Sequence, residues 1–255
     1  GVPSGMMALD KITNGWQKSD LIIIAARPAM GKTALVLTMA RNAAVQFQHP
    51  VAVFSLEMSS LQLVTRLISS ETGLDAALLK TGKLADHEME QLHAGIKEIS
   101  DAPMFIDDTP AISIFQLRAK ARRLKEHQKI GMIIVDYLQL MSGKDDSRGN
   151  REQEIAYISR SLKGLAKELN IPVIALSQLS RNLMNRTGGD KRPQLSDLRE
   201  SGAIEQDADM VMFIYRPEYY GIEVDEDNNP TKGLAEIIVA KHRNGALDTV
   251  KLKFI

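Results

Sequence analysis

The sequence predicts an α/β domain in which helices cover both faces of a mostly parallel, twisted β-sheet. Short apolar runs rich in β-branched residues alternate along the chain with amphipathic stretches of helical length. Such alternation is typical of parallel sheets, because each crossover between parallel strands needs a connecting helix. The last two strand-like runs are joined by a turn instead, so we expect an antiparallel extension at one edge of the sheet.

The expected elements follow one another in a regular order. The strand-like runs before the tail are Leu21–Ala25, Val51–Ser55, Met104–Asp107, Met132–Asp136, Val173–Ser177 and Met210–Tyr215. Helical patterns lie between them at Ala34–Ala40, Leu61–Ser70, Asp86–Ser100, Ser113–His127 and Glu152–Leu169. The tail contains two further strand-like runs, Leu234–Lys241 and Thr249–Phe254, connected through Asn244-Gly245, which is a strong hairpin turn signal.

The composition restricts the class of protein. At 255 residues the chain can bury its own core, and we expect residues 1–255 to form a single domain of a longer protein. Apolar residues make up 44% and charged residues 25%, which is ordinary for a globular protein. No apolar run approaches the ~20 residues that span a membrane, so we expect no membrane partner and a cytoplasmic location. The absence of cysteine excludes disulfides and thiolate zinc sites.

The charge is balanced, with 32 basic and 32 acidic side chains. A protein that binds nucleic acid usually carries a basic excess, so binding by this chain would require a local concentration of positive charge. Two long polar connections, Ser142–Asn150 and Ser180–Ser196, follow strands. Long loops at the carboxyl ends of parallel strands are a common place for ligands to bind.

A phosphate-binding loop is predicted where the first strand ends. Its residues are Ala26, Arg27, Pro28, Ala29, Met30, Gly31, Lys32 and Thr33, followed by Ala34 in the next helix. A loop wrapped round a phosphate points its backbone N–H groups inward, and the helix N-terminus adds positive charge. Lys32 would reach the β- and γ-phosphates of a nucleotide, and the Thr33 hydroxyl would hold Mg²⁺. The alternative is a surface turn with a chance Gly-Lys-Thr.

The loop departs from the usual pattern at one position, because Ala26 stands where the pattern begins with Gly. We expect that position to turn sharply, and alanine has the smallest side chain that could still do so.

Polar residues at three other strand ends could converge on this loop. Asp136 ends an apolar strand in the Walker-B manner and could hold Mg²⁺; alternatively it caps the following segment. Glu57 lies just past the second strand and could polarise the attacking water, or it could be a charge at the start of a helix. Gln178 follows the strand after that of Asp136, where it could contact the γ-phosphate or be an ordinary polar loop residue.

Several longer strings resemble one family, the C-terminal RecA-like ATPase domain of DnaB-type replicative DNA helicases. The strings that carry the resemblance run in order over nearly the whole chain: Ala26–Thr33, Phe54–Met58, Ile134–Leu140, Ile158–Lys163, Ala175–Arg181, Asp197–Gly202, Ile204–Asp209 and Lys241–Gly245. In this family the first loop position is commonly Ala or Gly. The resemblance implies a RecA-like P-loop core with a C-terminal hairpin, which hydrolyses ATP with Mg²⁺.

The resemblance also implies roles for individual residues. The expected nucleotide contacts are Ala26, Arg27, Pro28, Ala29, Met30, Gly31, Lys32, Thr33 and Ala34, and the expected metal ligands are Thr33 and Asp136. Glu57 is the expected catalytic carboxylate and Gln178 the γ-phosphate sensor. Similar proteins form hexameric rings with ATP between subunits, where Lys241 and Arg243 would reach the neighbour's γ-phosphate. His242 stands where Gln is more familiar, and we expect its side chain to point the other way.

Single-stranded DNA is the partner that the resemblance implies for the segment from Ser180 to Gly202. Between Ser180 and Arg199, basic residues outnumber acidic ones: Arg181, Arg186, Lys191, Arg192 and Arg199 against Asp190 and Asp197. The expected DNA-binding residues are Arg181, Arg186, Lys191, Arg199, Glu200 and Gly202, which would hold backbone phosphates without reading bases. The alternative is a solvated basic loop. A primase and a helicase loader are further expected partners, and we expect the N-terminal collar domain and linker helix of such helicases to lie outside this chain.

Two other functions compete with a helicase motor. A recombinase-like protein would form an ATP-switched filament on DNA without unwinding it, and Glu57 and Gln178 fit both functions. The strings Leu198–Gly202 and Ile204–Asp209 favour the helicase. A RecA-type regulatory ATPase that binds protein is disfavoured by the basic loop.

Overall fold

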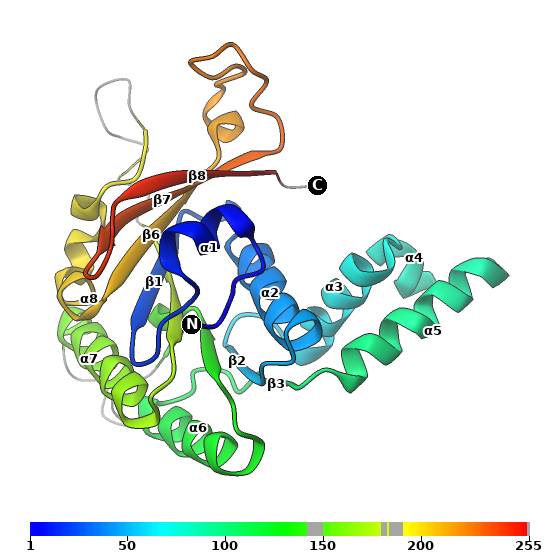
Figure 1. Cartoon of the computed structure of the whole chain (residues 1–255), viewed down its shortest axis with the longest axis horizontal. Helices are drawn as coiled ribbons and strands as arrows, with labels where there is room; N and C mark the ends of the chain where they lie inside the picture. The colour runs from blue at the N-terminus through cyan, green and yellow to red at the C-terminus, as the bar shows by residue number, and fades with distance from the viewer. Residues whose placement is uncertain (142–149, 180–182, 184–190, 254–255) are drawn as a thin grey trace.

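A single mixed β-sheet organises the chain (Figure 1). The computed structural model describes residues 1–141, 150–179, 183 and 191–253, with the backbone alone described at 199–201. Its 8-stranded sheet has the order β3-β2-β4-β5-β1-β6-β7-β8. The strands are β1 Leu21–Ala26, β2 Val51–Ser55, β3 Met104–Asp107, β4 Met132–Asp136, β5 Val173–Gln178, β6 Met210–Tyr215, β7 Leu234–His242 and β8 Asp248–Lys253. Strands β1 to β6 run parallel, whereas β7 and β8 are antiparallel, as the sequence predicts.

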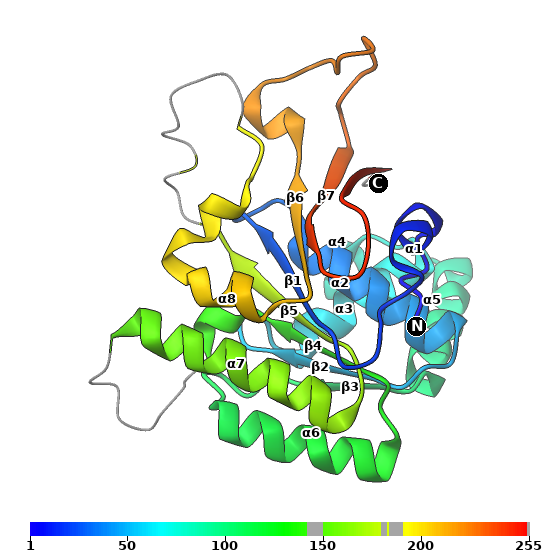
Figure 2. The same cartoon turned by 60° about the vertical axis from the view of Figure 1, so that its left-hand side comes forward.

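Helices cover both faces of the sheet (Figures 1 and 2). The α-helices are α1 Met7–Thr13, α2 Lys32–Arg41, α3 Ser60–Thr72, α4 Ala76–Thr81, α5 Asp86–Asp101, α6 Ile114–Gln128, α7 Arg151–Leu169 and α8 Gly202–Asp207. A π-helical turn, Asn42–Gln46, extends α2, and 3₁₀ segments occur at Leu138–Leu140, Leu195–Ser201 and Pro217–Tyr220. Helices α6, α7 and α8 pack on one face, and α1, α2 and α3 on the other.

The central strand β1 shows why the sheet needs two helical layers. Its residues are buried throughout. Leu21, Ile23 and Ala25 face the core beneath α6 and α7, whereas the alternate residues face the core beneath α2. A strand buried on both faces reads as an unbroken apolar run, because successive side chains point to opposite sides.

The expected strands and long helices are confirmed, with boundaries that shift by a few residues. Helices α1, α4 and α8 were not expected from the sequence. They are six or seven residues long, and α4 contributes no buried residue, so none of them gives the chain a sustained helical pattern of apolar residues. The expected strand end at Phe254 and the connection Ser142–Asn150 fall largely outside the described residues.

The C-terminal hairpin is confirmed, but its turn differs from the usual Asn-Gly type. Residues 243–247 connect β7 to β8, and neither Asn244 nor Gly245 has the positive φ that a two-residue type I′ turn requires. The space at 245 suits glycine as long as the His242 ring keeps its place. A Cβ atom there would lie 2.0 Å from the His242 ring, which folds back toward the carbonyl oxygen of Ala246.

The two ends of the parallel strands form different edges of the molecule. At the carboxyl-terminal edge, Ala26 is paired with Gln178 and Ser55 with Asp136. At the amino-terminal edge, Met210 of β6 is paired with His242 of the antiparallel strand β7. The length of β1, roughly 15–20 Å for a strand of this size, separates the two edges.

Candidate nucleotide-binding site

The phosphate loop lies between β1 and α2. Ala26 is fully buried and still paired within the sheet, so it is not the residue that turns. The turning positions are Ala29, with φ 67°, and Gly31, with φ 85°, and α2 begins directly afterwards. This corrects the expectation that Ala26 turns sharply. A small residue fits at 26 because the position is enclosed, and left-handed residues in the loop give the backbone N–H concavity that binds anions.

Lys32 is an unusually buried lysine at the start of α2. It is 8% exposed, and its Nζ atom lies 4.4 Å from the centre of the Tyr137 ring. Burial lowers the pKa of Lys32, although the carboxylates of Asp136 and Glu57 oppose that shift. A buried ammonium group without full compensation is suited to binding an anion such as a phosphate.

Asp136 and Thr33 meet at the end of β4. The Thr33 hydroxyl donates to Asp136 Oδ2 at 3.1 Å, whereas Asp136 Oδ1 is buried and accepts no hydrogen bond from the described residues. Burial raises the pKa of Asp136, and the Thr33 hydroxyl and Lys32 counteract this. A buried carboxylate with an unused oxygen beside a hydroxyl fits Mg²⁺, which takes oxygen ligands.

The sequence predicts only two protein ligands for Mg²⁺, Thr33 and Asp136. Among the described residues, no three His, Cys, Asp or Glu side chains gather into a metal-binding group. Mg²⁺ in nucleotide sites is usually held by one or two protein ligands, while water and substrate phosphates complete its coordination shell.

Glu57 lies at the same edge of the sheet. It is exposed and directly follows β2 and Leu56, whose backbone N–H donates to the carbonyl oxygen of Asp136. Its negative charge contributes to raising the pKa of Asp136 and of Tyr137, so the groups lie within electrostatic reach. The cap of α3 is another residue, Ser59, whose side chain accepts from the Gln62 backbone. Glu57 is therefore not needed to cap that helix.

Gln178 ends β5 beside the loop, and a residue that sequence reasoning did not single out holds its backbone. The Gln139 amide donates to Ser177 Oγ at 2.7 Å and to the Gln178 carbonyl oxygen at 3.3 Å, and its Oε1 atom accepts from the Gln178 N–H at 3.2 Å. Gln139 therefore fixes the strand end that carries the expected sensor. The only sign of this role in the sequence is that Gln139 closely follows Asp136, at the end of the strand next to β5.

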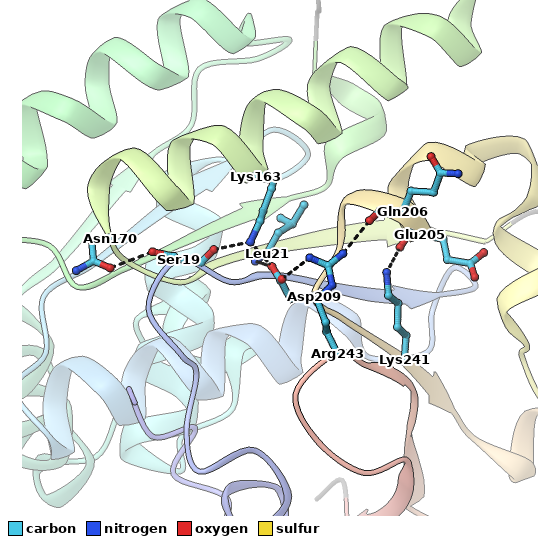
Figure 3. Close-up of polar contacts among 9 residues, drawn as sticks. All are labelled: Ser19, Leu21, Lys163, Asn170, Glu205, Gln206, Asp209, Lys241 and Arg243. Atoms are coloured by element: carbon cyan, nitrogen blue, oxygen red, sulfur yellow. Dashed lines mark hydrogen bonds and ion pairs between the residues drawn. The ribbon is translucent and has the colours of Figure 1, made fainter.

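Lys241 and Arg243 lie at the amino-terminal edge of the sheet, opposite the phosphate loop. Figure 3 shows their polar contacts. Lys241 Nζ donates to the Glu205 carbonyl oxygen, and the Arg243 guanidinium contacts Asp209 and the carbonyl oxygen of Gln206. Burial lowers the pKa of Lys241, with a further contribution from Arg243. With the length of the sheet in between, these cations do not converge on the phosphate loop of their own chain.

The expected DNA segment is described only in part. Arg181 and Arg186 lie outside the described residues, and the side chains of Arg199 and Glu200 are likewise not described. Lys191 is half-buried, and Gly202 begins α8. Arg192 is bound to Glu236 of β7 at 2.6 Å and lies over the Tyr215 ring, so it anchors the end of the segment to the sheet.

The described helices also bear on the membrane expectation: none of them has the length and apolar character that crossing a bilayer requires.

A parallel sheet with a phosphate loop after its central strand, and a buried carboxylate at a neighbouring strand end, defines a P-loop nucleotide-binding domain. The family model described as DnaB-like helicase C terminal domain matches residues 1–255. The chain therefore belongs to the family of DnaB-like helicase C-terminal domains.

Curated relatives are similar in sequence over the whole length of this chain. The replicative DNA helicase DnaB of Geobacillus stearothermophilus is 52% identical over 255 residues, and the replicative DNA helicase DnaC of Bacillus subtilis is 49% identical. The match covers 100% of this chain and 55% of each relative, so the chain spans about half the length of these proteins.

Solved structures share the fold. One of them, described as an ATPase domain, superposes with a TM-score of 0.90 at 40% identity, over 100% of this chain and 88% of that one. A DnaB-like replicative helicase, whose structure was described together with its interactions with primase, gives a TM-score of 0.89 at 40% identity and covers 100% and 60%.

Proposed function

We propose that the chain is the ATP-hydrolysing motor domain of a ring-shaped replicative DNA helicase, which moves along single-stranded DNA and separates the duplex. The observation that carries the proposal is the family match over all 255 residues, combined with the strand-end cluster around Lys32 and Asp136. About half of the curated relatives' length is outside this chain, so unwinding is proposed for the whole protein.

The proposed nucleotide site uses the residues at the carboxyl-terminal edge of the sheet. The loop from Ala26 to Thr33 and the start of α2 would bind the phosphates of ATP, and Thr33 and Asp136 would hold Mg²⁺, which neutralises charge on the transferred phosphoryl group. Glu57, exposed at this edge, would orient the attacking water and accept its proton. Gln178 would contact the γ-phosphate and relay its loss to the segment that follows β5.

The proposed partners are a neighbouring subunit and DNA. Lys241 and Arg243, remote from their own phosphate loop, would complete the site of the next subunit in a homohexameric ring. Arg181, Arg186, Lys191, Arg199, Glu200 and Gly202 would contact the DNA backbone. A primase is proposed because a structurally similar helicase is described with one, and a loader and a cytoplasmic location are proposed from the resemblance.

Strand separation tests this function directly. The whole protein should unwind a forked duplex with Mg²⁺ and ATP, but not with Mg²⁺ and ADP, and Glu57→Gln should abolish unwinding while DNA binding persists. ATP hydrolysis stimulated by single-stranded DNA, with no strand separation and with filaments in place of rings, would contradict the proposal and support the recombinase-like function.

A further inference from the structure

Arg243 is fixed by Asp209 in two ways. Its backbone N–H donates to the Asp209 carbonyl oxygen at 2.8 Å, and its guanidinium Nη1 atom contacts Asp209 Oδ1 at 3.0 Å. A second guanidinium nitrogen donates to the carbonyl oxygen of Gln206, near the end of α8 (Figure 3). Both the position and the direction of the arginine side chain are therefore set within its own subunit.

Asp209 itself has little freedom to move. Its side chain is 7% exposed, and Oδ2 accepts from Lys163 Nζ at 2.6 Å and from the Leu21 backbone at 2.9 Å. Lys163 also donates to the Ser19 carbonyl oxygen, so α7 and the start of β1 together hold the carboxylate (Figure 3). One oxygen of Asp209 is thus committed to the core of the domain, and the other is left for Arg243.

The arrangement holds Arg243 without enclosing it. The Arg243 side chain is 46% exposed, and the contacts with Asp209 and Gln206 engage two of the five N–H donors of a guanidinium. An arginine that must reach across a subunit interface loses side-chain entropy when it is ordered there. Ordering it beforehand on a rigid carboxylate removes that loss from the binding step.

We propose that Asp209 is the positioning residue for Arg243, presenting the guanidinium at the edge of one subunit so that it completes the nucleotide site of the next. The inference rests on the proposed trans role of Arg243 and adds the residue that sets its geometry. Asp209 touches neither nucleotide nor reacting atoms and acts only through Arg243.

The primary test is complementation between subunits in mixed rings of the whole protein. Lys32→Ala subunits lack a working phosphate loop but keep their cations, whereas Asp209→Asn subunits keep the loop and misplace Arg243. Each variant alone should hydrolyse ATP poorly; for Asp209→Asn we expect kcat to fall about ten- to a hundredfold with KM for ATP unchanged. In randomly mixed rings about a quarter of the interfaces pair a good loop with a well-placed arginine, and activity should return accordingly.

A reference pair separates this proposal from the function on which it rests. Lys32→Ala mixed with Arg243→Ala should recover activity in the same way, because that mixture tests the trans role alone. Recovery there without recovery for Asp209→Asn would overturn the positioning role and leave the proposed function intact. Recovery in neither mixture would overturn the trans role and the positioning role together.

Lys163→Met is the matched control for the structural role of the same carboxylate. It removes the other cation bound to Asp209, but the Leu21 N–H still holds Oδ2 and Arg243 keeps its contacts with Asp209 and Gln206. We therefore expect kcat to stay within about twofold of the parental value even if thermal stability falls. If Asp209→Asn alone does not fold, the double variant Asp209→Asn with Lys163→Met removes the buried carboxylate together with its partly buried cation and serves in its place. A parental kcat in either Asp209 variant would contradict the proposal.

Discussion

Lys32 and Asp136 show how single residues at this site are prepared for a charged ligand. Both are almost completely buried, and burial favours the neutral form of each side chain. It lowers the pKa of the lysine and raises the pKa of the carboxylic acid. A phosphate beside Lys32 and a cation beside Asp136 would reverse both shifts, because opposite charges favour the ionised forms. In the proposed site, the cost of burying these two charges would thus become a source of affinity for a nucleotide with its metal.

Two substitutions at this scale should separate binding from hydrolysis. Lys32→Ala removes a charged contact to phosphate and should weaken ATP binding about ten- to a hundredfold. Glu57→Gln keeps the size of the side chain but not its basicity, so binding should change little while kcat falls by roughly 10²–10⁴-fold. Titration with a fluorescent ATP analogue and a phosphate-release assay measure the two effects. A parental hydrolysis rate for Glu57→Gln would remove this residue from the catalytic role.

At the scale of elements, helix α3 is tied to α2 by one ion pair. Arg41 donates to both carboxylate oxygens of Glu71, at 2.7 and 3.0 Å, and the Glu71 side chain is 9% exposed. The hydrogen bonds from Arg41 hold the pKa of Glu71 below its ordinary value of 4.5, against the effect of burial. The pair therefore connects the helix after the phosphate loop to the helices α3 and α5, which extend beyond the edge of the sheet (Figure 1).

This pair predicts a specific dependence of stability on pH. Because the pKa of Glu71 is lowered in the folded protein, its contribution is present above pH 4.5 and is lost as the pH falls through the lowered pKa. Glu71→Gln should reduce the free energy of unfolding by about 1–2 kcal/mol at pH 7, and the difference should shrink below pH 4.5.

Urea denaturation at several pH values measures the effect. The matched control is Glu168→Gln, because Glu168 forms a similar two-bond pair with Arg122 at an exposed site, with side chains 44% and 47% exposed. That variant should lose less stability at pH 7. An equal loss in both variants, or a Glu71→Gln effect that does not change with pH, would contradict the role of the buried pair.

The elements also show which features the sequence alone predicts. Strands such as Leu21–Ala26 are predictable because a continuous apolar run indicates burial on both faces. Asp136 is predictable because it ends such a run, and Lys32 because the Gly-Lys-Thr loop pattern follows one. The turning residue of the loop was misplaced at Ala26, since φ values are not readable from a motif. The partner of Asp209 at the Leu21 backbone lies 188 positions away, so only the folded sheet brings the two together.

For the whole molecule, the decisive feature is the separation of two functional edges by the length of the sheet. The phosphate loop, Asp136 and Gln178 lie at the carboxyl ends of the parallel strands, whereas Lys241 and Arg243 lie at the amino ends. In the proposed ring, one subunit would therefore present its nucleotide site at one edge and Arg243, held by Asp209, at the other. A ring of heterologous contacts brings the unlike edges of neighbouring copies together.

The most direct measurement compares ATP hydrolysis per subunit in the monomeric and the assembled fractions of the same preparation, with sedimentation used to define each fraction. An arginine that acts in trans contributes roughly 10³–10⁵-fold to the rate of phosphoryl transfer. We therefore expect the monomer to be nearly inactive, and activity per subunit to rise in proportion to assembly, with single-stranded DNA raising it further. A monomer that hydrolyses ATP as fast as the assembled protein would contradict a site shared between subunits.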